Sequence, residues 1–214
     1  MGAPSLPIRD PQAQDRAVAC LRLGELVIVA TDTIYGIAAL PGLEGVIERL
    51  YRARGRTQEP SLPFLIAGID EMDGLVRVTP AAHHLAHKLW PGQMTLILPP
   101  AAELPPDYRT QPIAVRVPNH TPLLALLARA GGKLLMTGAI RSGYSPAITA
   151  AEAAELFRDD VALILDGGTA PYGVPSTIVD CTQDPPAIVR HGAVPDDKVR
   201  KTLAHGPATP RRVR

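Results

Sequence analysis

The sequence predicts a single α/β domain with a twisted, mostly parallel or mixed sheet and flanking helices. Apolar runs of strand length alternate along the chain with segments of helical periodicity, and no internal repeat interrupts them. The run 26–30 is continuously apolar, which is typical of a strand covered on both faces. A chain of 214 residues, 46% of them hydrophobic, is long enough to bury one core.

The individual elements follow from periodicity and from the residues that end them. Gly24 ends the first helix, because glycine is favoured directly after a helix C-terminus. We expect helices over 11–23, 43–54, 80–90, 122–130 and 150–157. We expect strands over 26–30, 62–67, 94–98, 113–117, 134–136, 162–165, 177–179 and 187–189. The apolar pattern fades from about residue 194, which predicts a domain over 8–195 and a flexible basic tail over 196–214.

The charge balance gives the molecule no overall field that would attract nucleic acid. Its 22 basic and 21 acidic residues leave a net charge of +1. Two distant cysteines predict buried, reduced thiols rather than a metal site. His83 and His87 lie four apart on an expected helix that lacks the HExxH glutamate, so we expect no metal there. We find no secretion signal and no run of about 20 apolar residues, which favours a cytoplasmic protein.

Polar motifs stand where the expected strands end. In an α/β sheet, the loops at strand ends converge on a ligand crevice. Arginine binds phosphate or carboxylate through two parallel hydrogen bonds. The chain has no Walker glycine loop and no GxGxxG pattern, so side chains would have to hold a nucleotide. We therefore expect a concave basic cavity, formed by the segments 31–36, 54–56, 115–118, 176–177 and 190–192.

Some of these motifs also have a simpler interpretation. Thr31 and Thr33 are typical of a turn held by bonds between side chains and backbone. Arg54 and Arg56 stand at an expected helix end, where a cation stabilises the helix dipole by about 0.3–1 kcal/mol. Arg116 is different, because it interrupts an apolar strand and its charge needs an internal partner or a ligand.

Taken in order, these segments resemble the motifs of the YrdC-like family of threonylcarbamoyl-AMP synthases. Residues 31–36 are similar to the family's PTDT-x-YG motif, with Ala30 in place of the proline. The other similarities are 51–56 to K-x-R, 89–96 to WPGPLTL, 115–118 to VRxP, 168–180 to DGG…G-x-STVVD and 190–192 to RxG. The resemblance covers roughly residues 9–195 and keeps the motifs in a consistent order.

The resemblance implies ATP-dependent synthesis of threonylcarbamoyl-AMP from L-threonine and bicarbonate, for formation of tRNA N6-threonylcarbamoyladenosine. The threonine amine takes up bicarbonate, and the carbamate then attacks the α-phosphate of ATP and expels pyrophosphate. The reaction needs no enzyme nucleophile, so it depends on positioning and on charge stabilisation, with Mg²⁺ as the expected helper. The expected partners are ATP, L-threonine, bicarbonate and RNA, with the oligomeric state left open.

The same resemblance assigns residues to roles. Arg54 and Arg56 are the expected catalytic residues. The expected nucleotide-binding residues are Thr33, Arg56, Arg116, Ala139, Arg141 and Arg190. The expected threonine-binding residues are Thr31, Tyr35, Ser176 and Thr177. No residue is expected to ligate a metal.

The chain departs from the family pattern at several of these positions. Arg54 replaces a lysine and keeps the charge without the compact ammonium group. In the segment 138–143, which replaces SAN-x-SG, Gly138 lacks a hydroxyl and Ile140 lacks an amide. Each unpaired buried partner costs roughly 1–3 kcal/mol, so the two losses together predict binding or turnover about a hundredfold weaker. Arg141, one residue on, is expected to compensate through phosphate, and Pro175 replaces a usual acidic residue.

Two other functions fit the same motifs. One is a protein without turnover that binds double-stranded RNA or tRNA in the basic cavity, with an affinity that falls steeply as salt increases. The other is a carbamoyl transferase, which would accept carbamoyl phosphate. The sequence leaves both open, together with the identity of the amino-acid substrate.

Overall fold

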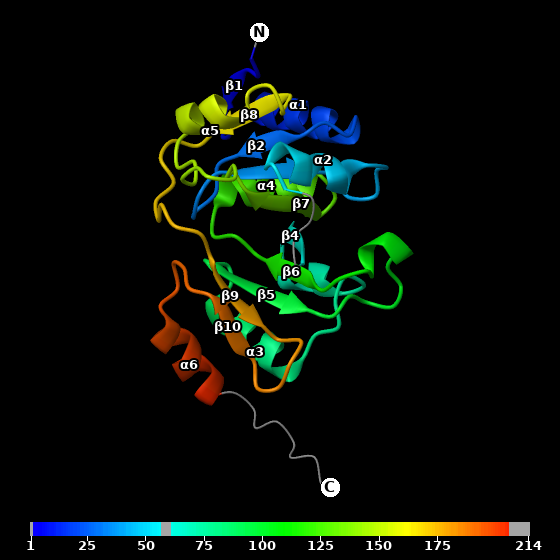
Figure 1. The fold of residues 1–214 in the computed structure, drawn as a ribbon, viewed down its shortest axis with the longest axis vertical. Coiled ribbons are helices and arrows are strands. Elements are labelled where there is room, and N and C mark those ends of the chain that lie inside the picture. The colour runs from blue at the N-terminus through cyan, green and yellow to red at the C-terminus, as the bar shows by residue number, and fades with distance from the viewer. Residues whose placement is uncertain (1, 57–60, 206–214) are drawn as a thin grey trace, which may run out of the picture.

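The computed structural model describes residues 2–56 and 61–205, which form one sheet flanked by helices (Figure 1). The strand order is β1-β8-β2-β3-β7-β4-β6-β5-β9-β10. The strands are β1 (Ser5–Pro7), β2 (Val27–Val29), β3 (Gly36–Ala39), β4 (Leu62–Ile66), β5 (Met94–Leu98), β6 (Ile113–Arg116), β7 (Lys133–Gly138), β8 (Leu163–Asp166), β9 (Thr177–Asp180) and β10 (Ala187–Arg190). The helices are α1 (Pro11–Arg22), α2 (Val46–Ala53), α3 (Pro80–Leu89), α4 (Thr121–Arg129), α5 (Ala150–Phe157) and α6 (Asp196–Ala204), with 3-10 turns η1 (Ile69–Met72) and η2 (Pro106–Tyr108). In these described ranges, no helix has the length and apolar character needed to cross a membrane.

Capping residues set where the helices begin. Asp10 accepts a hydrogen bond from the Gln12 amide at the start of α1, where a proline occupies the first turn. Thr149 and Glu152 form a capping box at the start of α5. Helix α2 begins only after Gly45, whose φ of 68° lies in the left-handed region. It is therefore shorter than the predicted helix over 43–54.

The sheet combines parallel and antiparallel pairs. Strand β8 is parallel to both of its neighbours, β1 and β2. Strand β4 is parallel to β6, and strand β5 is parallel to β9. The other neighbours are antiparallel. Adjacent strands rotate by about 20–25°, and four steps separate β2 from β6, so these two strands are expected to cross at about 90°. The loop after β2 meets the C-terminal end of β6 through contacts of Arg116 with Asp32 and Thr33.

The predicted fold class, a single α/β domain with a mixed sheet and flanking helices, is confirmed. All the expected strands are present, whereas β1 and β3 were missed. Strand β3 reads Gly-Ile-Ala-Ala, and small residues give little local preference for a strand. Its antiparallel pairing with β2 and β7 makes it part of the buried sheet.

The expectation of a flexible tail over 196–214 is wrong for its first part. Residues Asp196–Ala204 form α6, with Val199 buried in the core and His84 Nε2 of α3 lying 3.1 Å from the Thr202 carbonyl oxygen. Two aspartates in the first turn of α6 suit the helix dipole. Because β1 also precedes residue 8, the fold extends past 8–195 at both ends. Residues 206–214, the rest of the predicted tail, lie outside the described residues.

Candidate functional site

The loop between β2 and β3, residues 30–35, is held in shape by its own threonines. Thr31 Oγ1 donates to the Ile34 carbonyl oxygen (2.6 Å) and accepts from the Thr33 amide (3.0 Å). The two threonine hydroxyls are 3.0 Å apart. Because the single Thr31 hydroxyl hydrogen goes to Ile34, Thr33 is the donor between them. The turn interpretation of this motif is therefore confirmed, and substrate contacts of Thr31 and Thr33 stay predictions.

Arg116 is buried at the end of β6 and contacts this loop. Its guanidinium forms an ion pair with Asp32, and it donates to Thr33 Oγ1 (2.9 Å) and to the Gly92 carbonyl oxygen (2.7 Å). Burial lowers the pKa of Arg116, and the Asp32 carboxylate opposes that shift. Of the two possibilities that the sequence left open for Arg116, an internal partner or a ligand, the structure shows the internal partner, Asp32. Arg116 fixes the loop, and its predicted contact with a nucleotide stays a prediction.

Ser176 and Arg190 meet where β9 begins and β10 ends. Arg190 donates to Ser176 Oγ and to the Ser176 carbonyl oxygen, both at 2.9 Å. Ser176 Oγ also lies 2.7 Å from Thr95 Oγ1. Thr177 is engaged elsewhere, because its hydroxyl donates to the Val194 carbonyl oxygen (2.6 Å) and its side chain is fully buried. Thr177 therefore anchors the segment leading to α6, and its hydroxyl hydrogen is not available to the predicted threonine ligand.

Gln93 joins these two groups into one network. The side-chain amide of Gln93 donates to Asp32 Oδ2 (2.8 Å), and the backbone carbonyl oxygen of Gln93 accepts from the backbone amide of Thr177 (3.0 Å). Segments that the sequence predicted to converge, 31–36, 115–118, 176–177 and 190–192, are thus connected. We call this network the strand-end cluster, and its members are Thr31, Asp32, Thr33, Gln93, Thr95, Arg116, Ser176 and Arg190.

Gln93 and Thr95 were not among the predicted site residues. Along β5, Met94 and Leu96 are buried, while Thr95 between them is half-buried. A hydroxyl on the opposite face of an otherwise apolar strand was a signal for a polar surface there. Gln93 directly precedes the strand and carried no comparable signal.

Tyr35 attaches the end of the same loop to β8. Its hydroxyl lies 3.0 Å from Asp166 Oδ1 and 2.7 Å from the Gly168 carbonyl oxygen, and it accepts from the Gly167 amide at 3.1 Å. Burial is the main reason that the pKa of Tyr35 is raised to about 12. The neutral phenol thus holds the loop in place, and its predicted contact with threonine stays a prediction.

A second group of predicted residues lies on the β7 side of the loop. Arg54, buried at the end of α2, donates to the Ile140 carbonyl oxygen (3.2 Å) and to Thr137 Oγ1. The Ala139 amide donates to the Tyr35 carbonyl oxygen (2.8 Å). Arg54 and Ala139 therefore tie α2 and β7 to the loop, and their predicted roles toward ATP stay predictions.

An apolar contact occupies the position where the chain departs from the family pattern. A Cβ on Gly138 would lie 2.8 Å from Ile34 Cδ1 and 3.4 Å from Ile140 Cδ1. Gly138 therefore makes room for Ile34, and a serine there would require Ile34 to move. Arg141, predicted to compensate through phosphate, forms an ion pair with Asp160 instead. A phosphate contact of Arg141 would have to compete with that pair.

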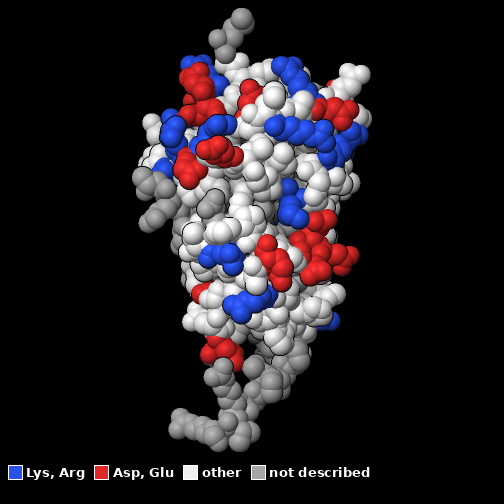
Figure 2. Space-filling model, turned by 90° about the vertical axis from the view of Figure 1, so that its right-hand side faces the viewer, with Lys and Arg blue, Asp and Glu red and all other residues white. Residues whose placement is uncertain are grey.

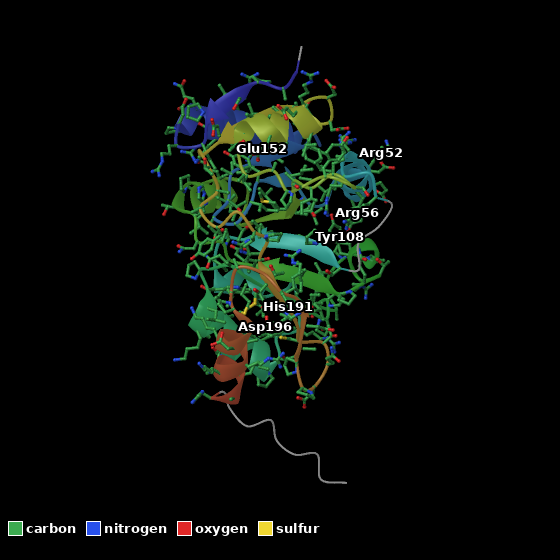
Figure 3. The ribbon with its side chains drawn as sticks, turned by 60° about the vertical axis from the view of Figure 1, so that its left-hand side comes forward. Arg52, Arg56, Tyr108, Glu152, His191 and Asp196 are labelled. Carbon is green, nitrogen blue, oxygen red and sulfur yellow. The ribbon has the colours of Figure 1, made fainter. Side chains whose placement is uncertain are left out.

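Arg56 and Arg190 stand on different parts of the fold. Figure 3 shows Arg56 just beyond α2, while His191, which follows Arg190, lies beside Asp196 at the start of α6. Both arginines are exposed. Figure 2 shows acidic and basic side chains intermingled on the face it presents. The concave basic cavity and the convergence of Arg56 with the cluster stay predictions.

His120 caps α4 in its neutral form. The Leu123 amide donates to its Nδ1 (3.3 Å), so that nitrogen must be unprotonated. Burial lowers the pKa of His120, although the Asp32 carboxylate opposes the shift. Above the unfolded-state pKa of about 6.5, a neutral histidine of this kind makes its full contribution to the unfolding free energy. As pH falls below this value, the unfolded state takes up the proton more readily than the folded state, and the protein loses stability.

We therefore expect the unfolding free energy of the wild type to decrease between about pH 7 and pH 5 by more than that of His120→Asn. Asparagine also caps helices and does not titrate in this range. Urea unfolding of both proteins at several pH values measures the difference. An identical pH dependence in the two proteins would show that His120 does not titrate as described.

A family model described as "Telomere recombination", the Sua5/YciO/YrdC model, matches residues 19–192. The chain belongs to this family. The matched range contains the whole strand-end cluster and the β7 group, so the resemblance inferred from the motifs is confirmed at the level of the family.

Individual members of the Sua5/YciO/YrdC family match most of this chain. Threonylcarbamoyl-AMP synthase of Pyrococcus abyssi is 33% identical over 191 residues, which are 87% of this chain and 56% of that protein. The crystal structure of P. abyssi Sua5 complexed with L-threonine has a TM-score of 0.86 and 30% identity, covering 94% of this chain and 61% of that one. E. coli YciO has a TM-score of 0.81 and 25% identity, covering 92% and 97%. The chain thus spans little more than half of the P. abyssi protein and nearly all of YciO.

Proposed function

We propose that this protein synthesises threonylcarbamoyl-AMP from L-threonine, bicarbonate and ATP and releases pyrophosphate. Family membership and the name of the P. abyssi relative support this substrate set. The observation that carries the proposal is the β2–β3 loop, which is bonded to Arg116 on one side and to the β7 end on the other. A loop fixed on both sides is pre-organised to position substrates. The departures at Gly138 and Ile140 imply weaker nucleotide binding than the family pattern would give.

The chemistry needs alignment and charge stabilisation. A C–N bond forms between the threonine amine and bicarbonate with loss of water, and a carbamate oxygen then attacks the α-phosphorus. The bond to the β-phosphate breaks, and pyrophosphate leaves with the electron pair. We assign Arg56 and Arg190 to the phosphates, because both are exposed cations that can stabilise the developing charge. Ser176 is assigned to threonine, and Arg116 is a positioning residue.

Mg²⁺ enters this proposal only as an ion carried by the nucleotide. Asp32 supplies the carboxylate of the strand-end cluster, and its oxygens already accept from Arg116, Gln93 and the Asn119 amide. A carboxylate engaged in this way does not fit a metal site made by the protein. The triphosphate oxygens would hold the ion, which would screen their charge.

Pyrophosphate release with each substrate omitted in turn tests the proposal. We expect release only when L-threonine, bicarbonate and ATP are all present. Arg56→Gln should reduce the rate by about a hundredfold, because it removes a group that stabilises the transition state. Arg52→Gln removes the same charge from the same helix end and should stay near the wild-type rate (Figure 3).

Release without threonine, or equal losses in the two variants, would contradict the proposal. Turnover with carbamoyl phosphate would identify a carbamoyl transferase instead. Binding of double-stranded RNA or tRNA in the predicted basic cavity, without any turnover, would identify the RNA-binding alternative instead. We place the reaction in the cytoplasm, where ATP and tRNA are found.

A further inference from the structure

The groove between α3 and α6 gathers much of the chain's lysine. A cavity of about 460 Å³ is lined by His84, Lys88, Leu89, Lys198, Lys201, Thr202 and His205. These described lining residues include no carboxylate, and they include three of the chain's four lysines. Most of the chain's lysines thus line this groove, while the two aspartates of α6 stand in its first turn.

The basic residues form a row on each helix. Lys198, Lys201 and His205 recur at spacings of three and four on α6, which places them on one helix face. His84 and Lys88 lie four apart on α3 in the same way. The lysines are exposed, and the two helices lie side by side at the end of the molecule where the described chain finishes (Figure 1). The groove thus presents Lys88 on one side and Lys198 and Lys201 on the other.

The groove has a fixed frame and accessible charges. His84 Nε2, 3.1 Å from the Thr202 carbonyl oxygen, joins the helices, and Val199 anchors α6 in the core. Lys201 lies 3.3 Å from Asp197, with side chains 76% and 70% exposed. An ion pair this exposed is worth about 0–1 kcal/mol, so a ligand anion can replace Asp197 as the partner of Lys201.

We propose that the α3–α6 groove binds the phosphate backbone of a nucleic acid. Three spaced ammonium groups, of which Lys201 has only an exposed and weak carboxylate partner in Asp197, suit a row of phosphates. A membrane surface fits less well, because Val199 of α6 is buried in the protein and is not available to insert into a bilayer. None of the lining residues belongs to the strand-end cluster, so this binding is independent of the proposed synthesis.

Fluorescence anisotropy with labelled single-stranded RNA, duplex RNA and duplex DNA tests the proposal at about 50 to 200 mM salt. The groove variant is Lys88→Gln/Lys198→Gln/Lys201→Gln. The matched control, Arg22→Gln/Arg129→Gln/Lys133→Gln, removes the same charge elsewhere. We expect the groove variant to bind about tenfold or more weakly than the control, with a salt slope smaller by about 2–3. The control should bind nearly as the wild type does.

Equal weakening in both variants would overturn the proposal, because it would mean attraction by net charge alone. No binding of any nucleic acid by the wild type at about 50 mM salt would also overturn it. Tighter binding to phosphatidylserine vesicles than to nucleic acid would point to a membrane partner and overturn it as well. The substituted lysines are exposed, so thermal unfolding of the groove variant should match the wild type. Its pyrophosphate release should also be unchanged, which separates failure of this proposal from failure of the proposed function.

Discussion

Replacing Arg116 with methionine should destabilise the protein by about 3–5 kcal/mol, because Asp32 would remain as a buried charge without its partner. The Arg116 and Asp32 side chains are only 6% and 3% exposed. Thr33 Oγ1 and the Gly92 carbonyl oxygen would each lose a donor as well. The β2–β3 loop would therefore lose its main connection to β6. Urea unfolding followed by circular dichroism measures the change.

A double-mutant cycle and a surface ion pair provide the controls. Arg116→Met combined with Asp32→Asn should cost less than the sum of the single changes, because neither charge is then left alone. Arg129 pairs with Asp15 at the surface, where the side chains are 42% and 66% exposed. Arg129→Met should cost about 0–1 kcal/mol. If Arg116→Met were equally mild, Arg116 would not have the organising role assigned to it.

Gly192→Ala should displace Ser176 and remove most of the proposed activity. A Cβ on Gly192 would lie 2.5 Å from the Pro175 carbonyl oxygen and 2.5 Å from the carbonyl carbon and oxygen of Ser176. These are backbone atoms, so no side-chain rotation relieves the clash, and separating the segments costs about 1–3 kcal/mol. The separation would break the bonds between Arg190 and Ser176. We expect pyrophosphate release to fall about a hundredfold.

Gly68→Ala is the matched control for this substitution. The φ of Gly68 is −163°, an extended backbone that alanine adopts, and a Cβ there would meet nothing within 4 Å. Its unfolding free energy should stay within about 0.5 kcal/mol of the wild type, with normal pyrophosphate release. Full activity in Gly192→Ala would mean that the pairing of Ser176 with Arg190 is not needed.

Elements with their own sequence signal were predicted, and elements that depend on their neighbours were missed. The continuous apolar run at β2 predicts a buried strand by itself. Strand β3, with its alanines and glycine, becomes a strand only because β2 and β7 pair with it. Helix α6 is mostly polar, and its contact with α3 and the buried Val199 stabilise it. No periodicity along the chain reports such contacts.

The same distinction holds for the candidate site. The sequence indicated that Arg116 needed a partner or a ligand, but Asp32 lies 84 positions away and is brought near only by the folding of the chain. Gly192 belonged to a recognised motif, yet its close approach to Pro175 and Ser176 is visible only in the structure. Gln93 was missed because its role depends on a loop from another part of the chain.

A crystal structure with L-threonine and a non-hydrolysable ATP analogue tests most directly whether the strand-end cluster is the substrate site. We predict threonine within hydrogen-bond distance of Ser176 Oγ, with the triphosphate directed toward Arg190 and with the Arg116–Asp32 pair intact. Threonine bound only at another place, or no bound threonine at saturating concentration, would contradict this assignment.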